Sequence, residues 1–305
     1  MYIQGEKMRK VKNILGINDI HKKGIKGKGT CVAILDSGIE PHPDFNNRIV
    51  EFKDFVDDKK TNYDDEGHGT HVAGIIAGGG TMSRGIMGGI APEADIVSLK
   101  VLDKHGKGRE RDVISGIWWI IDNGKKYNIK VVNISFGTTA KVSEENRKLI
   151  EAVELLWDLG YVVVAAAGNN GPGIGTVSTP GDSRKIITVG AENDNVKTVV
   201  NGRMLKNYSG CGPTKQCIQK PDVVAPANNI YSCCNMWKRG YAYIPKSGTS
   251  MATPIVSGVV CLMLSKYNYS NIMCKKIIKS TAVDLNMDKN RQGWGRINPL
   301  FLADS

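Results

Sequence analysis

Five short apolar runs, rich in β-branched residues, recur along the first two thirds of the chain. They cover residues 30–35, 96–101, 131–135, 161–166 and 186–190. Apolar runs of this length are typical of strands that are buried on both faces of a parallel sheet. The pattern therefore predicts five buried strands.

Segments with apolar residues at helical spacing lie between and after these runs. Two of them, 109–126 and 143–159, separate predicted strands, and two more follow at 250–266 and 271–281. Strands that alternate with helices of this length form βαβ units, in which helices cover the faces of a parallel sheet. We therefore expect an α/β fold with a mainly parallel central sheet and helices on both faces.

A basic arm precedes the first predicted strand. Residues 1–29 hold eight lysine or arginine side chains and two acidic ones, which is more than half of the net charge of +11. We predict a solvated arm at 1–29 and one domain at 30–305. The alternative, a tether for nucleic acid or anionic lipid, lacks the aromatic residues that usually accompany such basic segments. We therefore expect no nucleic-acid partner.

The sequence also indicates in which cellular compartment the protein is found. The longest apolar runs fall short of the ~18 residues that span a bilayer, so we expect no membrane span. The basic start is not followed by the apolar stretch of a signal peptide. Seven cysteines without C-x-x-C spacing indicate reduced thiols and a cytoplasmic protein. A disulfide between Cys211 and Cys217 is an alternative. The mature form of a secreted protein is the alternative, because it would show the same pattern.

Three separated motifs carry residues suited to nucleophilic catalysis. Asp36 ends the first predicted strand, His68 lies in "GHGTHVAG", and Ser250 lies in "SGTSMATP" at the start of an apolar helix. Singly, they fit a turn aspartate, a core histidine and a helix cap, and the pair His68 and His71 lacks further metal ligands. Together they fit a triad, because a serine needs a histidine base and that base needs a carboxylate.

These motifs resemble those of the subtilisin-like serine proteases, the subtilases. "LDSGIEPHPDF", "GHGTHVAG", "AAAGNNG" and "SGTSMATP" occur in the family's order, and "GWGRINP" resembles its last segment. The resemblance implies a three-layer α/β fold and a serine endopeptidase. In it, Asp36 orients His68, His68 is the general base and then acid, and Ser250 is the nucleophile. Asn169 and the Ser250 backbone N–H would form the oxyanion hole, with Thr249 in support.

The resemblance also implies where a peptide substrate would bind. Ser135, Phe136 and Gly137 match the strand edge on which the family pairs the substrate backbone. The positions that match the walls of the pocket for the P1 side chain are Ala166, Ala167, Gly168, Val177 and Ser178, and those around P4 are Glu110, Val113 and again Phe136. No charge occurs among the P1 positions, which predicts a broad neutral or hydrophobic preference. The Glu110 carboxylate would favour lysine or arginine at P4, unless it pairs with a neighbouring arginine.

Two acidic features concern metal binding and loop structure. The loop 78–89 lacks the Asn-rich stretch that ligates calcium in secreted subtilases, although Asp44 matches one carboxylate ligand. Calcium takes about 6–8 oxygen ligands, so we expect no metal site and no required cofactor, with calcium as the weaker alternative. The acidic run 64–66 is expected to be a solvated loop.

Peptides or unfolded proteins are therefore the expected partners. A dedicated processing protease that cuts one precursor or leader is an alternative with the same catalytic residues. A non-catalytic binding module is a more remote alternative, because no triad residue is missing. The sequence indicates no particular oligomeric state.

Overall fold

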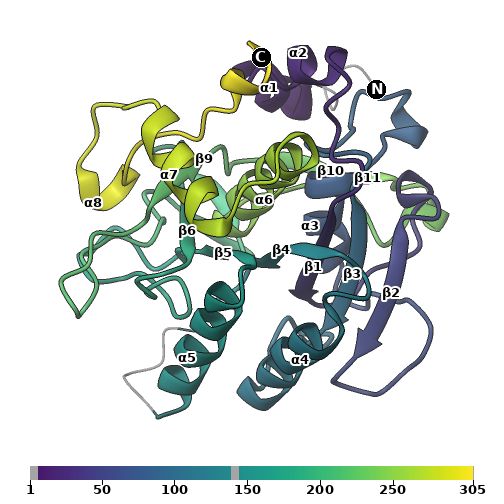
Figure 1. Ribbon diagram of the computed structural model, residues 1–305, viewed down its shortest axis with the longest axis horizontal. Helices are drawn as coiled ribbons and strands as arrows, with labels where there is room; N and C mark the ends of the chain where they lie inside the picture. The colour runs from purple at the N-terminus through teal and green to yellow at the C-terminus, as the bar shows by residue number, and fades with distance from the viewer. Residues whose placement is uncertain (1–5, 139–143, 305) are drawn as a thin grey trace.

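A seven-stranded sheet forms the centre of the computed structural model, which describes residues 6–138 and 144–304 (Figure 1). All neighbouring strands in it are parallel, in the order β2-β3-β1-β4-β5-β6-β9. The strands are β1 (Cys31–Asp36), β2 (Ile49–Asp54), β3 (Asp95–Lys100), β4 (Ile129–Ile134), β5 (Val162–Ala166), β6 (Ile187–Ala191) and β9 (Val223–Ala225). The expected parallel α/β sheet is confirmed.

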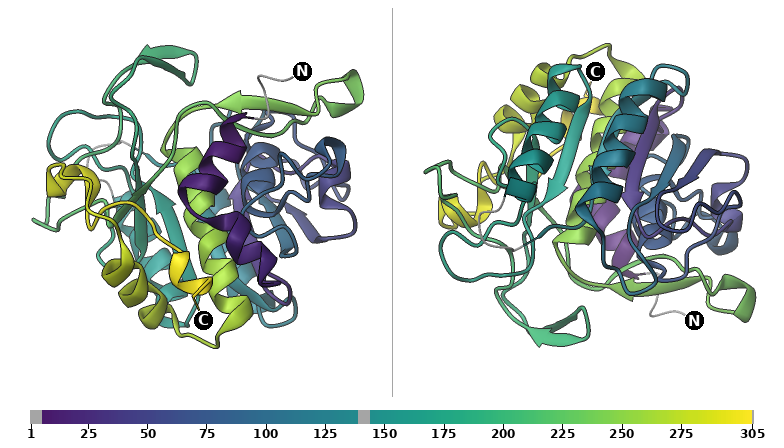
Figure 2. Two further views of the ribbon diagram at one scale, coloured as in Figure 1. Left: turned by 90° about the horizontal axis from the view of Figure 1, so that it is seen from above. Right: turned by 90° about the horizontal axis from the view of Figure 1, so that it is seen from below.

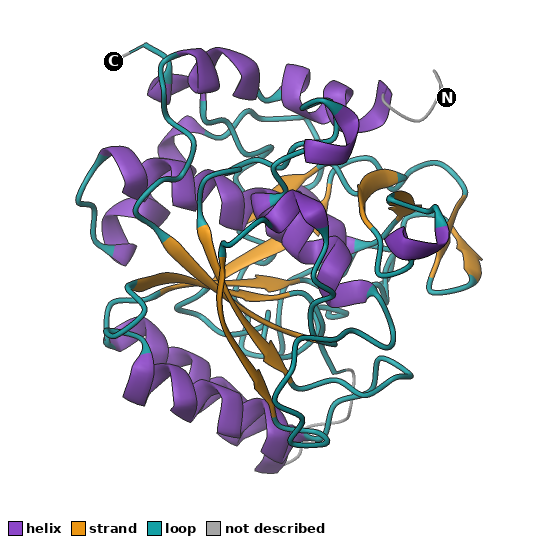
Figure 3. Ribbon diagram, turned by 90° about the vertical axis from the view of Figure 1, so that its right-hand side faces the viewer, coloured by secondary structure: helices purple, strands orange, loops and turns teal. Residues whose placement is uncertain are grey.

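Helices cover both faces of this sheet, as Figures 1 and 3 show. One face carries α3 (His68–Ala77), α6 (Thr249–Lys266) and α7 (Asn271–Thr281), and the other carries α4 (Glu110–Asn123) and α5 (Glu144–Asp158). The four predicted helices are confirmed within three residues wherever the structure describes their ends. The three-layer arrangement is the one that the sequence predicts.

The five predicted strands are β1, β3, β4, β5 and β6, each within two residues of its expected bounds. Two strands of the sheet were not predicted. In β2, partly exposed side chains alternate with buried ones at the sheet edge, and β9 has three residues, too few for a recognisable pattern. Edge and very short strands carry little periodic signal.

Shorter elements surround the sheet. Two antiparallel pairs lie outside it, and one of them, β10–β11, contacts α3. These elements are β7 (Thr198–Val200), β8 (Arg203–Leu205), β10 (Ile230–Cys233), β11 (Tyr243–Lys246), α8 (Lys289–Gln292) and the 3₁₀ turns η1 (Pro43–Phe45), η2 (Thr81–Ser83), η3 (Trp237–Arg239) and η4 (Leu300–Leu302).

The basic N-terminal arm is folded, so the prediction of a solvated arm is wrong for its described part. It forms α1 (Glu6–Ile14) and α2 (Ile17–Lys22), which contact β10 and η4 (Figure 2). The inward side chains of these helices and of the turn between them are fully or almost fully buried in the common core: Met8, Val11, Leu15, Ile17 and Ile20. A count of charged residues does not reveal this amphipathic pattern, because the lysines and arginines lie between the apolar positions.

Helix α6 is apolar along its whole length. By length and composition it would be long enough to cross a membrane, and it is the one such helix among the described residues. It contacts five strands of the central sheet as well as α3, and most of its residues are buried. Its composition is that of a core helix, which is apolar all round because it is covered all round.

The sheet changes direction at β1. The chain first extends the sheet on one side of β1 through β3 and β2, and then continues on the other side with β4. In open α/β sheets, ligands bind beyond the carboxyl ends of the strands at such a switch point. Asp36 at the end of β1 and the segment 135–137 after β4 lie at this edge.

Candidate active site

Asp36 and His68 meet at the carboxyl edge of the sheet. Asp36 is the last residue of β1 and is buried, and His68 is the first residue of α3. The Nδ1 atom of His68 lies 2.8 Å from Oδ1 and 3.0 Å from Oδ2 of Asp36. Because a carboxylate accepts hydrogen bonds, this contact keeps a proton on Nδ1 and leaves Nε2 available as a base.

Glycines make this close approach possible. Gly67, which precedes α3, has a φ of +94°, a conformation that glycine adopts without strain. A Cβ atom at Gly69 would lie 2.1 Å from the carbonyl oxygen of Gly38 and 3.2 Å from Cβ of Asp36. The prediction that glycines around His68 let the backbone approach a neighbour is confirmed.

The surroundings of His68 shift its pKa in opposite directions. Burial lowers the pKa of the imidazole, whereas the charge of Asp36 and its hydrogen bond raise it. Lys246 lowers the pKa and Glu66 raises it to a smaller extent, and the net result is a pKa above the ordinary value. The imidazole is therefore prepared to accept a proton and to carry the positive charge that results.

Ser250 is the second residue of α6 and is half-buried. Gly248 precedes the helix with a φ of +138°, so the sharp turn expected there is present. Helix α6 packs directly against α3, which carries His68. Within the described chain, Ser250 forms no hydrogen bond with the imidazole; catalytic contacts of this kind often tighten only when substrate binds.

Asn169 is tied to the start of the same helix. Its Oδ1 atom accepts hydrogen bonds from the Thr249 backbone N–H at 3.0 Å and from the Thr249 hydroxyl at 3.1 Å. A backbone N–H can only donate, so the amide oxygen must face Thr249 and the NH₂ group must point elsewhere. The structure thus places Asn169 and Thr249 together beside Ser250, and it fixes which end of the amide is free to donate.

Two of the segments expected to bind the substrate pack against the segment that carries Ser178. Ser178 is buried, and its side chain lies between Gly137 and Gly168, where added Cβ atoms would lie 2.7 Å and 2.0 Å from it. The Ser178 hydroxyl accepts a hydrogen bond from Asn170 at 3.0 Å, and the Ser178 N–H donates to the Ala167 carbonyl. The two segments are thus packed against one another.

The remaining predicted subsite residues are placed as follows. Ser135 is buried, Phe136 is half-buried and Gly137 is exposed just beyond β4, and Ala166 ends β5 next to the sheet core. Val177 is partly exposed and lines a large cavity with Asn170 and residues of α5.

The segment expected around P4 is the start of α4. Glu110 is its first residue, and Val113 lies in the core with 3% of its surface exposed. The neighbouring Arg109 and Arg111 both direct Nε to the carboxylate of Asp112, at 2.6 Å and 3.3 Å. Both arginines are therefore paired with Asp112, and the Val113 side chain packs α4 against the core.

The acidic run before His68 is not a solvated loop, so that prediction is wrong. Asp64 is buried, and its carboxylate accepts hydrogen bonds from the Ser37 hydroxyl, from the N–H groups of Glu66, Gly67 and Thr70, and from the Thr70 hydroxyl. The next two carboxylates form ion pairs, as described below. The run thus holds the end of β1 and the start of α3 together.

A buried lysine joins the same edge of the sheet. Lys100 ends β3 beside Asp36 and is fully buried, and its ammonium group donates to the carbonyls of Ser37 and Leu102. It also lies 2.7 Å from Asp65, and Glu66 lies 3.5 Å from Lys246. Sequence reasoning did not identify Lys100, because an apolar strand gives no sign that its last lysine is satisfied internally.

His71 is a core histidine, as the simpler interpretation predicts. Its Nε2 atom lies 3.0 Å from the carbonyl oxygens of Ile230 and Ile244, so it donates to the β10–β11 pair. Burial lowers the pKa of His71 to about 3, which keeps the ring neutral. His68 and His71 therefore serve different partners and do not form a metal pair.

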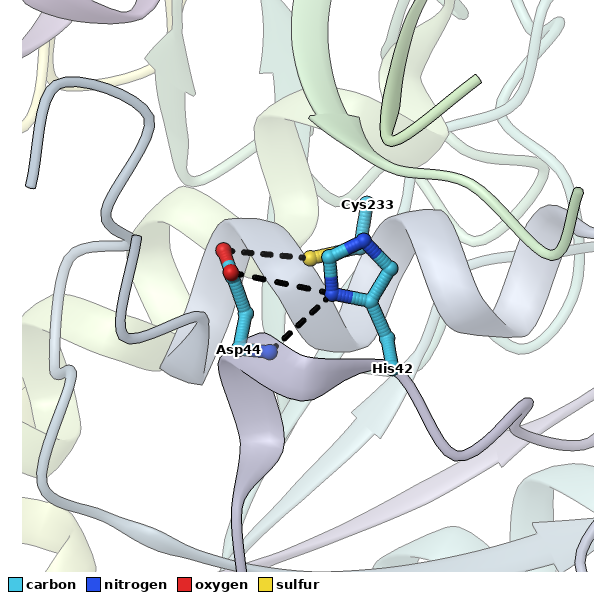
Figure 4. A group of neighbouring side chains, drawn as sticks. All are labelled: His42, Asp44 and Cys233. Atoms are coloured by element: carbon cyan, nitrogen blue, oxygen red, sulfur yellow. Dashed lines mark hydrogen bonds and ion pairs between the residues drawn. The ribbon is translucent and has the colours of Figure 1, made fainter. Parts of the chain in front are cut away.

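Asp44, the one residue that matches a calcium ligand, lies in a buried cluster with His42 and Cys233 (Figure 4). Its oxygens accept hydrogen bonds from the N–H groups of Gly80 and Met82 at 3.0 and 3.1 Å and from the Tyr243 hydroxyl at 2.9 Å. Donor hydrogens directed at both oxygens oppose a cation there. The residues around Asp44 therefore do not fit a calcium site.

The other two members of the cluster are also occupied. His42 Nδ1 accepts the Asp44 N–H at 3.1 Å, and His42 Nε2 lies 3.0 Å from the Ala242 carbonyl oxygen. Burial and the Asp44 carboxylate raise the pKa of the Cys233 thiol, which disfavours the thiolate that metals bind. The cluster is a satisfied polar contact between η1, the loop around η2 and the β10–β11 pair.

The sequence of this chain matches a known protein family. A profile of the subtilase family, peptidase family S8, matches residues 27–295. The chain belongs to the subtilase family. The resemblance to the subtilases that was drawn from the four motifs is thus confirmed.

Several relatives are similar over most of this subtilase. Serine protease AprX of Bacillus subtilis is 39% identical over 90% of the chain, which spans 66% of that relative, slightly less than two thirds. Subtilisin Savinase of Lederbergia lenta is 35% identical over 91% of the chain and 92% of the relative. Several matched relatives are thus longer than the matched region.

Solved structures show the same fold. Sphericase is 30% identical and superposes with a TM-score of 0.75, covering 90% of this chain and 92% of the other. A cold-adapted subtilisin-like serine proteinase gives a TM-score of 0.69 at 29% identity, covering 90% and 88% of the two chains. The subtilisin-like fold predicted from the sequence is confirmed.

Proposed function

We propose that this subtilase is a serine endopeptidase that hydrolyses peptide bonds in extended segments of peptides or unfolded proteins. The observation that carries the proposal is the hydrogen bond between the buried Asp36 carboxylate and Nδ1 of His68, whose helix packs against α6, the helix with Ser250 in its first turn. The names of the relatives support the same activity.

In the proposed first step, His68 Nε2 takes the hydroxyl proton of Ser250 as Oγ attacks the carbonyl carbon of the substrate. The resulting oxyanion would accept hydrogen bonds from the Asn169 NH₂ group and the Ser250 backbone N–H. The imidazolium, stabilised by Asp36, then gives its proton to the leaving amine, and the C–N bond breaks. Water then attacks the acyl-enzyme while His68 accepts a proton from it. The imidazolium returns that proton to Oγ of Ser250, and the carboxylic acid product leaves.

The proposed substrate preference rests on the packed residues beyond β4 and β5. Ser178 fills the space between Gly137 and Gly168, and these three positions contribute no charge. We therefore propose neutral P1 side chains. At P4, Phe136 supplies apolar surface, and Glu110 at the start of α4 would favour a basic side chain over an acidic one.

We also propose that the activity needs no calcium and belongs to a reducing compartment such as the cytoplasm. Asp44 is fully used by protein donors, which supports the first point. All seven cysteines are free thiols, including Cys211 and Cys217, which supports the second point.

Labelling with a fluorophosphonate tests the proposal directly. The purified protein should hydrolyse casein and carry one label on Ser250, located by mass spectrometry, and Ser250→Ala should lose both properties. Ser280→Ala, which changes an exposed serine on α7, is the matched control and should keep full activity. Hydrolysis by Ser250→Ala above a trace, or a label elsewhere, would refute the assignment.

A further inference from the structure

A second surface feature lies away from the triad. A groove of about 320 Å³ runs between the end of α5, the start of β6 and α7. We call it the tryptophan groove, because Trp157 and Trp294 line it together with Ile272 of α7. Trp157 and the residues before β6 lie at the amino ends of the strands, so the groove opens on the opposite edge of the sheet from Asp36.

The rim of the tryptophan groove is basic. Arg184, Lys276 and Lys279 are exposed, and within residues 6–138 and 144–304 none of them has a carboxylate partner. Lys185 also lines the groove but is paired with Asp158 at 2.7 Å. Three unpaired positive charges thus surround an apolar floor.

A fourth cation lies in the floor of the groove. The ammonium group of Lys275 is 5.6 Å from the ring centre of Trp157 and 5.9 Å from that of Trp294. It donates to the carbonyls of Lys185 and Ile186, at 2.7 and 2.8 Å. Lys275 also forms an ion pair with Asp222 at 3.4 Å, and burial lowers its pKa to about 8 although the Asp222 charge raises it.

The charges on the rim repel one another. Lys276 and Lys279 lie three residues apart on α7, and like charges at that spacing are neighbours on the helix surface and destabilise the helix. An anionic ligand on the rim would relieve this repulsion. An apolar side chain between Ile272 and Trp294 would bury surface that is otherwise open to water.

We propose that the tryptophan groove binds an acidic peptide segment that carries an aromatic or large aliphatic side chain. The apolar side chain enters between Ile272 and Trp294, and carboxylates on either side pair with Arg184, Lys276 and Lys279. Since the groove and Asp36 lie on opposite edges of the sheet, a partner or substrate can occupy it while another segment lies at Ser250.

Two other classes of ligand fit the groove less well. Nucleic acid bases stack on open aromatic faces, whereas the ammonium groups of Lys275 and Lys279 lie over Trp294, at 5.9 and 5.7 Å from its centre. Membrane binding uses apolar side chains that project from the surface, whereas Trp157 is 93% buried. A recessed floor with a charged rim fits a single inserted side chain.

Binding is measured with the full chain carrying Ser250→Ala, so that the peptide is not cut. The probe is a fluorescein-labelled twelve-residue peptide with one central phenylalanine among glutamates and aspartates, followed by fluorescence anisotropy. Lys276→Gln with Lys279→Gln should weaken binding at least tenfold. The matched control is Lys125→Gln with Lys130→Gln, two exposed lysines outside the groove, which should change it less than twofold.

Further measurements test the apolar part and the basic part of the site separately. Replacement of the phenylalanine by glycine, or the Ile272→Ser substitution, should weaken binding at least threefold. The proposal is overturned if the two lysine pairs have equal effects, or if phosphatidylserine vesicles or a single-stranded oligonucleotide bind through Lys276 and Lys279 and the peptide does not. Because this assay uses a chain without the nucleophile, its outcome is independent of whether the protein hydrolyses peptides.

Discussion

The Asp36 carboxylate controls the proton chemistry of His68 in two ways. Its hydrogen bond fixes the proton on Nδ1, and its charge raises the pKa of the imidazole against the effect of burial. Both effects depend on one buried residue at the end of β1. A change at Asp36 should therefore alter the rate and its pH dependence together, which a merely structural residue would not do.

The pH profile tests this dependence on Asp36. Hydrolysis needs neutral His68, so the rate should fall as pH drops through its pKa, which lies above the ordinary ~6.5. In Asp36→Asn the charge is gone, so the acid limb should move to lower pH, and the rate should fall by about 10⁴-fold. The measurement is kcat/KM between pH 5 and 9, with Asp122→Asn as an exposed control. An acid limb that stays in place would contradict the argument.

The candidate triad could be proposed from the sequence because its motifs are local. Each of Asp36, His68 and Ser250 stands in a block of glycines and small residues that is recognisable by itself. Asp64 and Lys100 were missed, because their burial depends on partners up to 63 residues away in the chain. An aspartate in a run of acidic residues has the same local sequence whether it is solvated or is buried and accepts hydrogen bonds from five donors.

At the scale of elements, the N-terminal helices are part of the core. Met8 and Leu15 are buried against the domain although they belong to the most basic segment of the chain. Met8→Ala or Leu15→Ala should lower the free energy of unfolding by about 2–5 kcal/mol, the range for large-to-small changes in a core. Urea unfolding followed by circular dichroism measures it. The exposed Lys10→Ala is the control and should stay within about 0.5 kcal/mol.

A second prediction at this scale concerns the contact that Asp44 makes between η1, η2 and β11. EDTA should leave the melting temperature unchanged, because protein donors already satisfy the carboxylate. Asp44→Ala should lower the free energy of unfolding by about 1–3 kcal/mol, since it leaves buried donors unpaired, and Tyr243→Phe should lower it by about 1 kcal/mol. A large fall in melting temperature with EDTA, reversed by calcium, would show a metal site.

Elements with strong periodic patterns were predictable, and weakly patterned ones were not. The central strands β1 and β3–β6 are continuous apolar runs, whereas β2 has polar residues on its exposed side. The N-terminal helices failed for another reason: their high charge was given more weight than the apolar positions 8, 11 and 15.

At the scale of the whole molecule, the fold determines which thiols can react. Cys217 is exposed, and the other six cysteines are buried. Burial also raises the pKa of Cys261 and Cys274 to about 12, which suppresses their thiolates. A disulfide reagent should therefore modify one thiol in the native protein, none in Cys217→Ser, and seven in guanidinium chloride. Fewer than seven after unfolding would indicate a disulfide.

The residues of the proposed triad come from distant parts of the chain, on either side of most of the parallel sheet. Asp36 ends β1, an inner strand of that sheet, and Ser250 lies in the first turn of a helix that contacts β1, β4, β5, β6 and β9. At the usual rate of about 5–20 residues per second, a ribosome takes about 10–40 s to proceed from Asp36 to Ser250. During that interval the growing chain already has its carboxylate and its imidazole but has no nucleophile. The order of synthesis therefore prevents a nascent copy from cutting itself or its neighbours before most of the sheet has been made.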